Sequence, residues 1–109
     1  MLGAFGAHAL HGVLDERALG IWHTAVEYQF WHALALLGAG VLARDAATRA
    51  LRCAVFAFVI GSVAFSASLY ALALGAPNIV GAITPFGGVA LILGWLSLGA
   101  HVWRDAVVR

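Results

Sequence analysis

The sequence predicts an all-α, polytopic membrane helical bundle, and three observations lead to this class. Of the 109 residues, 63% are hydrophobic and only 10% are charged, whereas soluble domains average about 45–50% apolar and about 25% charged residues. The mean hydropathy is +0.96. No Asp, Glu, Lys or Arg lies between Arg52 and Arg104. Since one membrane helix needs about 20 apolar residues, this interval has room for two helices and a turn, all within a single domain over residues 1–109.

The first two predicted helices cover residues 1–14 and 18–43. Residues 1–14 are apolar and rich in small residues, but as a helix they would span about 21 Å, short of a hydrocarbon core of about 30 Å. We therefore expect a truncated N-terminal helix that begins inside the membrane, followed by three full transmembrane helices. The charged run at 15–17 breaks the apolar pattern. The second helix is amphipathic in its first turns and apolar from Phe30 onward.

The third predicted helix covers 53–74 and is followed by a Gly-Ala-Pro-Asn run, which is typical of a turn. The fourth helix covers either 79–103 or 85–103. The later start is favoured by Pro85, which suits a first helical turn, and by Thr84, which can cap it. The earlier start would add an extra turn of apolar residues.

Charge predicts the orientation of this bundle. The loop at 44–52 carries three arginines and the tail at 104–109 carries two, whereas the turn at 75–78 is uncharged and the corner at 15–17 is net acidic. Cytoplasmic loops of membrane proteins are enriched in Lys and Arg. The basic loop and the C-terminus are therefore expected on the cytoplasmic side, and the other two turns outside.

Polar side chains from all four predicted helices fall at one depth. Counting 1.5 Å per residue from the outer helix ends places most of them within about 12 Å of the outer surface. Ionisable groups inside a membrane face the bundle interior, pair with one another or line a watered cavity, so we expect these groups to converge. The predicted polar cluster consists of His8, Glu27, Tyr28, Gln29, His32, Ser66, Ser68, Tyr70 and Thr84.

Three interpretations of this cluster stay open. The groups can form interhelical hydrogen bonds that fasten the bundle, or they can line a pocket for a small solute, a proton or a lipid-soluble cofactor. A metal or haem site is the third interpretation, because His8, His11, His32 and Glu27 would suit zinc or copper chemically. No compact metal motif is present, so no metal ligand and no cofactor are predicted.

Small residues recur at helical spacing and predict close helix packing. Spacings of four between small residues let helix backbones approach each other in membranes. The predicted packing positions are Gly3, Gly6, Gly61, Ala64, Gly87, Gly88, Ala90 and Gly94.

Several function classes find no support in the sequence. Nucleophile-elbow, zinc-protease, phosphate-loop and dinucleotide-binding motifs are all missing, so we predict no enzyme and no catalytic residue. The six arginines do not form a nucleic-acid footprint. Cys53, the single cysteine, excludes an internal disulfide. The expected partners are the lipid bilayer and either further copies of the chain or another membrane protein. The leading hypothesis is a non-enzymatic accessory subunit or self-associating bundle.

Four motifs in the same order resemble the YgdD/YwdK family of small bacterial inner-membrane proteins, domain of unknown function 423, to which eukaryotic transmembrane protein 256 is similar. They are LGAFGAHAL (2–10), EYQFWHALALL (27–37), GSVAFSASLYALAL (61–74) and ITPFGGVALILGW (83–95). The resemblance implies a four-helix protein of the bacterial inner membrane with a longer first helix, and it carries no known activity over to this chain. The positions that match the family's motif residues are Gly3, Gly6, His8, Glu27, Tyr28, Gln29, His32, Ser66, Ser68, Tyr70, Thr84, Pro85, Gly87 and Gly88.

Overall fold

The computed structural model of the protein describes residues 3–4, 15–44 and 47–108. In chain order these form α2 (Glu16–Ala43), α3 (Arg49–Ala73), the short 3-10 helix η1 (Asn78–Ala82) and α4 (Ile83–Val108). This described part of the chain holds no β-strand, and the predicted all-α class is confirmed. The predicted helix over 1–14 lies outside the described residues, apart from Gly3 and Ala4, whose backbone is helical.

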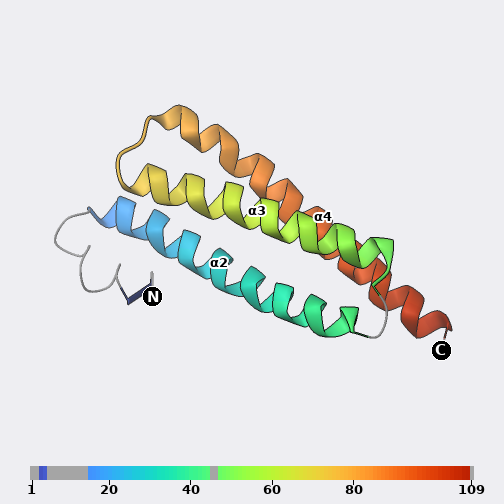
Figure 1. The fold of residues 1–109 in the computed structure, drawn as a ribbon. Coiled ribbons are helices and arrows are strands. Elements are labelled where there is room, and N and C mark those ends of the chain that lie inside the picture. The colour runs from blue at the N-terminus through green and yellow to red at the C-terminus, as the bar shows by residue number, and fades with distance from the viewer. Residues whose placement is uncertain (1–2, 5–14, 45–46, 109) are drawn as a thin grey trace.

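The three long helices lie side by side, with α3 in the middle (Figure 1). Consecutive helices run antiparallel, and α4 crosses behind α3, from one side of it near the α3–α4 turn to the other side toward the C-terminus. Both pack extensively on α3 but meet each other only weakly. The molecule is consequently long and flat, with principal extents of 54 × 27 × 15 Å.

Helix α2 begins earlier than the predicted start at residue 18, because the charged corner caps the helix and does not end it. The Asp15 carboxylate accepts a hydrogen bond of 2.7 Å from the backbone N–H of Ala18. Glu16 occupies the first turn, where a negative charge is favoured by the helix dipole. An aspartate at this position typically stabilises a helix by about 1 kcal/mol.

Helix α3 likewise begins one turn before the predicted start at residue 53. The Thr48 hydroxyl accepts a hydrogen bond of 3.2 Å from Leu51 N–H and so caps the helix. The arginines at 49 and 52 are therefore helical. Hydropathy predicts the residue at which the apolar span begins, whereas the capping residue determines where the helix begins. These two positions differ because the long side chains of arginines in the first turn can extend away from apolar surroundings.

The turn between α3 and α4 is stabilised by a Schellman motif. Gly75 has φ +99°, a conformation open to glycine at little cost. Its N–H donates to the Leu72 carbonyl at 3.1 Å, and Ala76 N–H donates to the Ala71 carbonyl at 2.9 Å. After η1, α4 starts at Ile83, between the two predicted starts, and continues past the predicted end at residue 103 to Val108.

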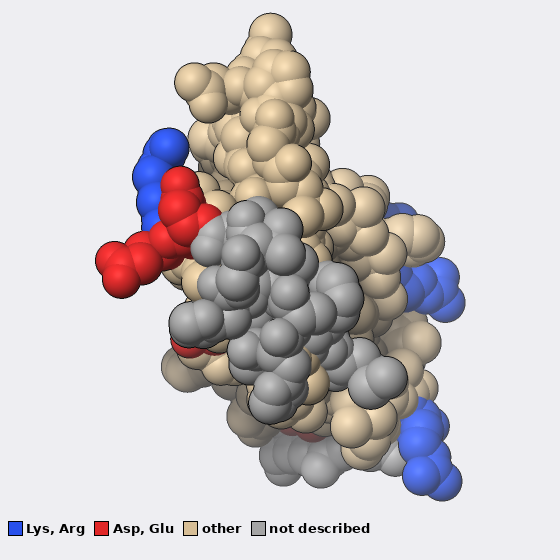
Figure 2. All heavy atoms as spheres, turned by 90° about the vertical axis from the view of Figure 1, so that its left-hand side faces the viewer, with Lys and Arg blue, Asp and Glu red and all other residues tan. Residues whose placement is uncertain are grey.

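The outer faces of the helices are strongly apolar. The described residues contain two helical stretches that are long and apolar enough to cross a membrane, Arg49–Ala73 and Asn78–Val107. Only 22% and 17% of their most apolar parts are buried inside the molecule, unlike the core helices of a soluble protein. Helix α2 does not reach the same apolarity, since Glu27, Gln29 and His32 interrupt it. On the face drawn in Figure 2, charged residues form small groups, mostly toward the edges, and most of the described surface is uncharged.

Helices α3 and α4 approach each other closely where glycines face large side chains. A Cβ added at Gly87 would lie 2.5 Å from the backbone nitrogen of Phe65, far inside van der Waals contact. The facing pairs are Phe65 with Gly87, Leu91 with Gly61, and Phe58 with Gly94. At these three glycines any side chain would collide, which is why the crossing needs them.

The other predicted packing positions are less tightly enclosed. A Cβ at Gly88 would make ordinary contact with the Phe65 ring at 3.8 Å, and one at Gly3 would lie 3.3 Å from Val26. Ala64 and Ala90 are partly buried. Gly6 lies outside the described residues.

Candidate functional site

His32 joins α2 to α4 in the middle of the bundle and is only 4% exposed. The Trp95 indole N–H donates to its Nε2 at 2.9 Å. Because Nε2 is an acceptor, the ring proton sits on Nδ1, which donates to the Tyr28 carbonyl at 2.7 Å. The ring also packs against Phe58, with centroids 5.7 Å apart. Both nitrogens of a neutral imidazole are thus occupied by groups of the protein itself.

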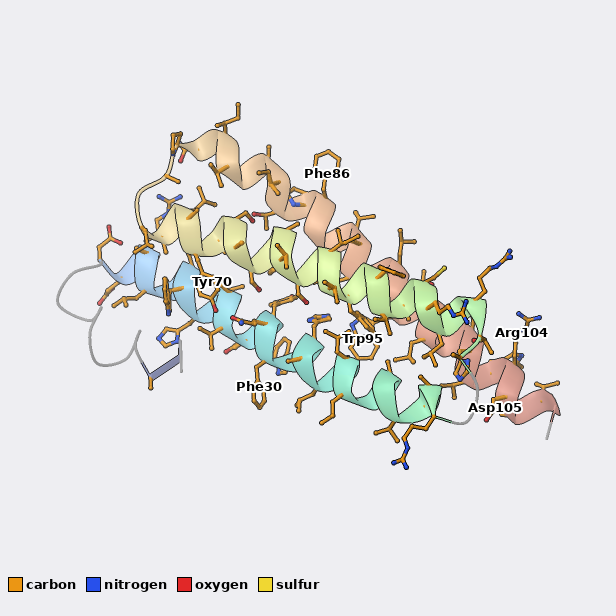
Figure 3. The ribbon with its side chains drawn as sticks, viewed as in Figure 1. Phe30, Tyr70, Phe86, Trp95, Arg104 and Asp105 are labelled. Carbon is orange, nitrogen blue, oxygen red and sulfur yellow. The ribbon has the colours of Figure 1, made fainter. Side chains whose placement is uncertain are left out.

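Two hydrogen bonds connect α2 to α3. The buried Ser66 hydroxyl donates to the Ala25 carbonyl at 3.0 Å. The Tyr70 hydroxyl donates to Oε1 of Gln29 at 2.6 Å, and the Tyr70 ring packs on Trp22 with centroids 4.4 Å apart. Figure 3 shows Tyr70 and Trp95 between helices, whereas Phe30 and Phe86 project outward.

A further pair of hydroxyls connects α3 to the start of α4. Ser68 and Thr84 lie 2.6 Å apart, oxygen to oxygen. The single hydroxyl proton of Ser68 is directed to the Phe65 carbonyl at 2.8 Å. Thr84 therefore donates and Ser68 accepts. This bond lies one turn from the close contact of Phe65 with Gly87.

The predicted polar cluster is therefore a set of separate pairs at helix contacts. Glu27 does not join it: its side chain is exposed and has no hydrogen bond or ion pair among the described residues. The reason is rotational. His32 lies five positions after Glu27 on the helix, which turns their side chains about 140° apart. The predicted cluster was based on depth along the helix axis alone, and depth contains no information on this angle. His8 lies outside the described residues.

Beside His32, α2 and α4 leave an aromatic groove over α3, with a volume of about 570 Å³. Trp31 and Trp95 both line the groove and are 50% and 47% exposed. The groove is lined by Tyr28, Trp31, His32, Leu34, Phe65, Gly88, Leu91, Ile92 and Trp95. Its size falls within the usual range of ligand pockets, about 300–1,000 Å³.

Sequence reasoning missed the aromatic partners of the polar residues. Trp95 lies in the middle of a long apolar helix, where an indole N–H requires an acceptor, and this was the available signal. His101 was missed as well, although a buried polar side chain in an apolar helix also requires a partner. It is 5% exposed, and its Nδ1 lies 2.7 Å from the hydroxyl of Thr48, the residue that caps the start of α3.

No three His, Cys, Asp or Glu side chains come together in the part of the chain that the structure describes. Cys53 is exposed and unpaired. Of the predicted metal candidates, His32 has both ring nitrogens occupied, and His8 and His11 lie outside the described residues.

Comparison with known proteins confirms the predicted resemblance. The sequence model of a family described as "Protein of unknown function (DUF423)" matches residues 2–88. The chain is 43% identical to the UPF0382 membrane protein YwdK of Bacillus subtilis, over 89% of this chain and 80% of YwdK. It is 46% identical to a UPF0382 membrane protein of Staphylococcus epidermidis, over 88% of this chain and 78% of that protein. A UPF0382 membrane protein of Haemophilus influenzae is 43% identical, over 89% and 77%. No solved structure matches the chain. The chain belongs to the DUF423 family and, like these relatives, is a membrane protein.

Proposed function

We propose that this protein is a multi-pass protein of the bacterial inner membrane that acts without catalysis, as an accessory subunit or a self-associating bundle. The observation that carries this proposal is the pairing of the interior polar groups. His32, Ser66, Ser68 and Tyr70 each bond to a neighbouring helix. No nucleophile lies beside a free base in these pairs, and nucleophilic catalysis needs such an arrangement.

The outer faces are where such a protein would meet its partners. They carry large apolar side chains on α3 and α4, for example Phe56 at 65% exposure and Phe86 at 77%. Few of the described residues lie outside the helices, so contacts with other proteins would occur mainly within the membrane. Van der Waals packing and interhelical hydrogen bonds drive association there.

The lengths of α2, α3 and α4 support three crossings of the membrane. Helices α2, α3 and α4 have 28, 25 and 26 residues, which corresponds to about 37–42 Å against a hydrocarbon core of about 30 Å. Helix α2 packs along α3 (Figure 1), so a membrane that α3 crosses would also enclose α2. Within α2, Gln29 bonds to Tyr70 of α3 and His32 is buried against α4, which supports a crossing despite the lower apolarity. The arginines at the α2–α3 turn and the end of α4 would then lie in the cytoplasm.

Topology can be tested with cysteines placed at the two turns. In a Cys53→Ser background, Asn78→Cys would react with a membrane-impermeant maleimide added to spheroplasts, whereas Ala47→Cys would react only after the membrane is opened. Both positions are exposed. The opposite labelling pattern would mean that the protein has the inverted orientation. Labelling of both turns from the same side of the membrane would contradict a crossing by α3.

Association can be tested separately by native mass spectrometry of the full chain released from its own membrane in mild detergent. A homo-oligomer or a complex with a second membrane protein is expected. A monomer that carries no partner, in several detergents and after cross-linking in the membrane, would contradict the accessory or self-associating role.

A further inference from the structure

The aromatic groove beside His32 continues along the bundle. A second hollow, of about 590 Å³, lies between the same two helices, and Leu34 lines both. The lining residues of α2 run from Tyr28 to Leu42, a distance of about 21 Å at 1.5 Å per residue. The lining residues of α4 also follow one another, from Ile92 and Trp95 in the first hollow to Leu98 and Val102 in the second, so we describe the two adjoining hollows as the two halves of one groove with α2 and α4 as its walls.

The two halves of this groove differ in chemistry. The first half is lined by the rings of Tyr28, Trp31, Phe65 and Trp95. The second half is aliphatic, with lining residues Leu34, Ala35, Leu37, Gly38, Ala39, Val41, Leu42, Leu98 and Val102. Aromatic rings favour offset stacking or edge contacts with another π-system, and an aliphatic channel favours an alkyl chain. A planar head and a flexible tail would match the two halves.

One polar group in the aromatic half, the Tyr28 hydroxyl, has no hydrogen-bond partner among the described residues. The Tyr28 ring is nevertheless held against Phe65, with centroids 4.5 Å apart, and against Trp31 at 5.3 Å. The other polar atoms there, on His32 and Trp95, bond to each other. The groove thus offers a ligand one phenol, able to donate to a carbonyl oxygen.

Charge indicates a neutral head. None of the residues that line either half of the groove carries a formal charge. A phosphate headgroup placed against these rings would lose hydration without gaining a counter-charge, which is costly. The groove therefore disfavours a phospholipid head in its aromatic half.

We propose that this groove binds a neutral membrane-soluble amphiphile with a planar, carbonyl-bearing conjugated ring and a long aliphatic tail, the chemistry of a prenylquinone. The ring lies among Tyr28, Trp31, Phe65 and Trp95, accepting a hydrogen bond from Tyr28, and the tail follows the aliphatic half. This binding goes beyond the proposed accessory role and does not depend on it.

The test uses the full chain in phosphatidylcholine nanodiscs and, as the probe, a photoactivatable azido derivative of decylubiquinone. Saturable labelling of α2 or α4 peptides at the groove is expected, with displacement by unlabelled decylubiquinone. Trp31→Leu is expected to fold, because Trp31 is already half exposed, and to weaken probe binding at least fivefold. Tyr28→Phe keeps the ring and loses one hydrogen bond, which corresponds to about fivefold weaker binding. Trp103→Leu is the matched control: Trp103 is 72% exposed on α4 outside the groove, so its loss should leave binding unchanged.

Three results would overturn the proposal. Labelling that does not saturate, or that is equal in the Trp31→Leu and Trp103→Leu proteins, would mean that the probe only partitions into the membrane. Equal displacement by phosphatidylglycerol would identify a lipid chain as the occupant. Disulfide cross-linking between two chains through Ile92→Cys, in a Cys53→Ser background and with no labelling, would identify the groove as an interface between copies. None of these outcomes alters the topology or association tests described above.

Discussion

Replacing Gly87 with alanine is the sharpest test of the packing between α3 and α4. The added Cβ would lie 2.5 Å from the nitrogen and 2.9 Å from the Cα of Phe65. Non-bonded heavy atoms need about 3.5 Å, and both opposing atoms belong to the backbone, so the two helices would have to separate by about 1 Å. Overpacking of this kind costs about 1–3 kcal/mol. The separation would also break the Ser68–Thr84 bond one turn away, for about 0.6 kcal/mol more.

We expect Gly87→Ala to lower the free energy of unfolding by about 0.6–2.6 kcal/mol, because the overpacking and the lost bond are partly offset by the gain of about 1 kcal/mol that alanine has over glycine in a helix. The measurement is SDS titration of the detergent-solubilised protein, followed by far-UV circular dichroism. Gly99→Ala is the matched control, because nothing lies within 4 Å of a Cβ added there, and alanine favours a helix over glycine by about 1 kcal/mol. Gly94→Ala should cost less than Gly87→Ala, since the atoms nearest to its added Cβ, at 2.8 Å, belong to the Phe58 side chain and not to the backbone. Equal stability of the Gly87 and Gly99 variants would refute the close crossing.

Three further predictions concern the polar pairs and use the same unfolding measurement. In a double-mutant cycle of His32→Phe with Trp95→Phe, we expect a coupling energy of about 0.6–1.7 kcal/mol from the 2.9 Å bond; additive effects would argue against that bond. Tyr70→Phe should cost about 0.6 kcal/mol through its hydrogen bond to Gln29, and this cost should vanish in a Gln29→Leu background. Glu27→Gln should change stability by less than about 0.5 kcal/mol, as for exposed positions without partners, and a larger loss would show that the carboxylate has a structural partner.

The polar residues of this bundle act as specific links between helices that are otherwise held by apolar contact. Inside a membrane, neighbouring lipid is as apolar as a leucine side chain, so burial alone does not select one helix partner over another. The Ser66–Ala25, Ser68–Thr84 and Trp95–His32 bonds each require a particular rotation and depth of two helices. They therefore set the register of the bundle more than its total stability.

Much of the fold and part of the site could be predicted from local sequence signals. The all-α class follows from composition, the turn at Gly75 from its Gly-Ala-Pro-Asn context, the close packing at Gly94 from its spacing of four residues from Ala90, and that at Gly87 from the Gly-Gly pair after Pro85. Each of these is a property of a few neighbouring residues or of the chain as a whole. Helix ends were less predictable, because Asp15 and Thr48 act as caps where charge suggested a break or a loop.

The amino-acid sequence fixes which residues are polar and where each stands along its helix, because position along a helix axis depends only on the rise per residue. Which polar residues meet becomes clear only after the helices have packed. Glu27 and His32 lie close in sequence and along α2, yet one is exposed and the other is buried against Trp95. Partner choice depends on the rotation of each helix about its axis and on the residue across the contact. Both arise when α2, α3 and α4 pack together, and neither can be read from any one helix.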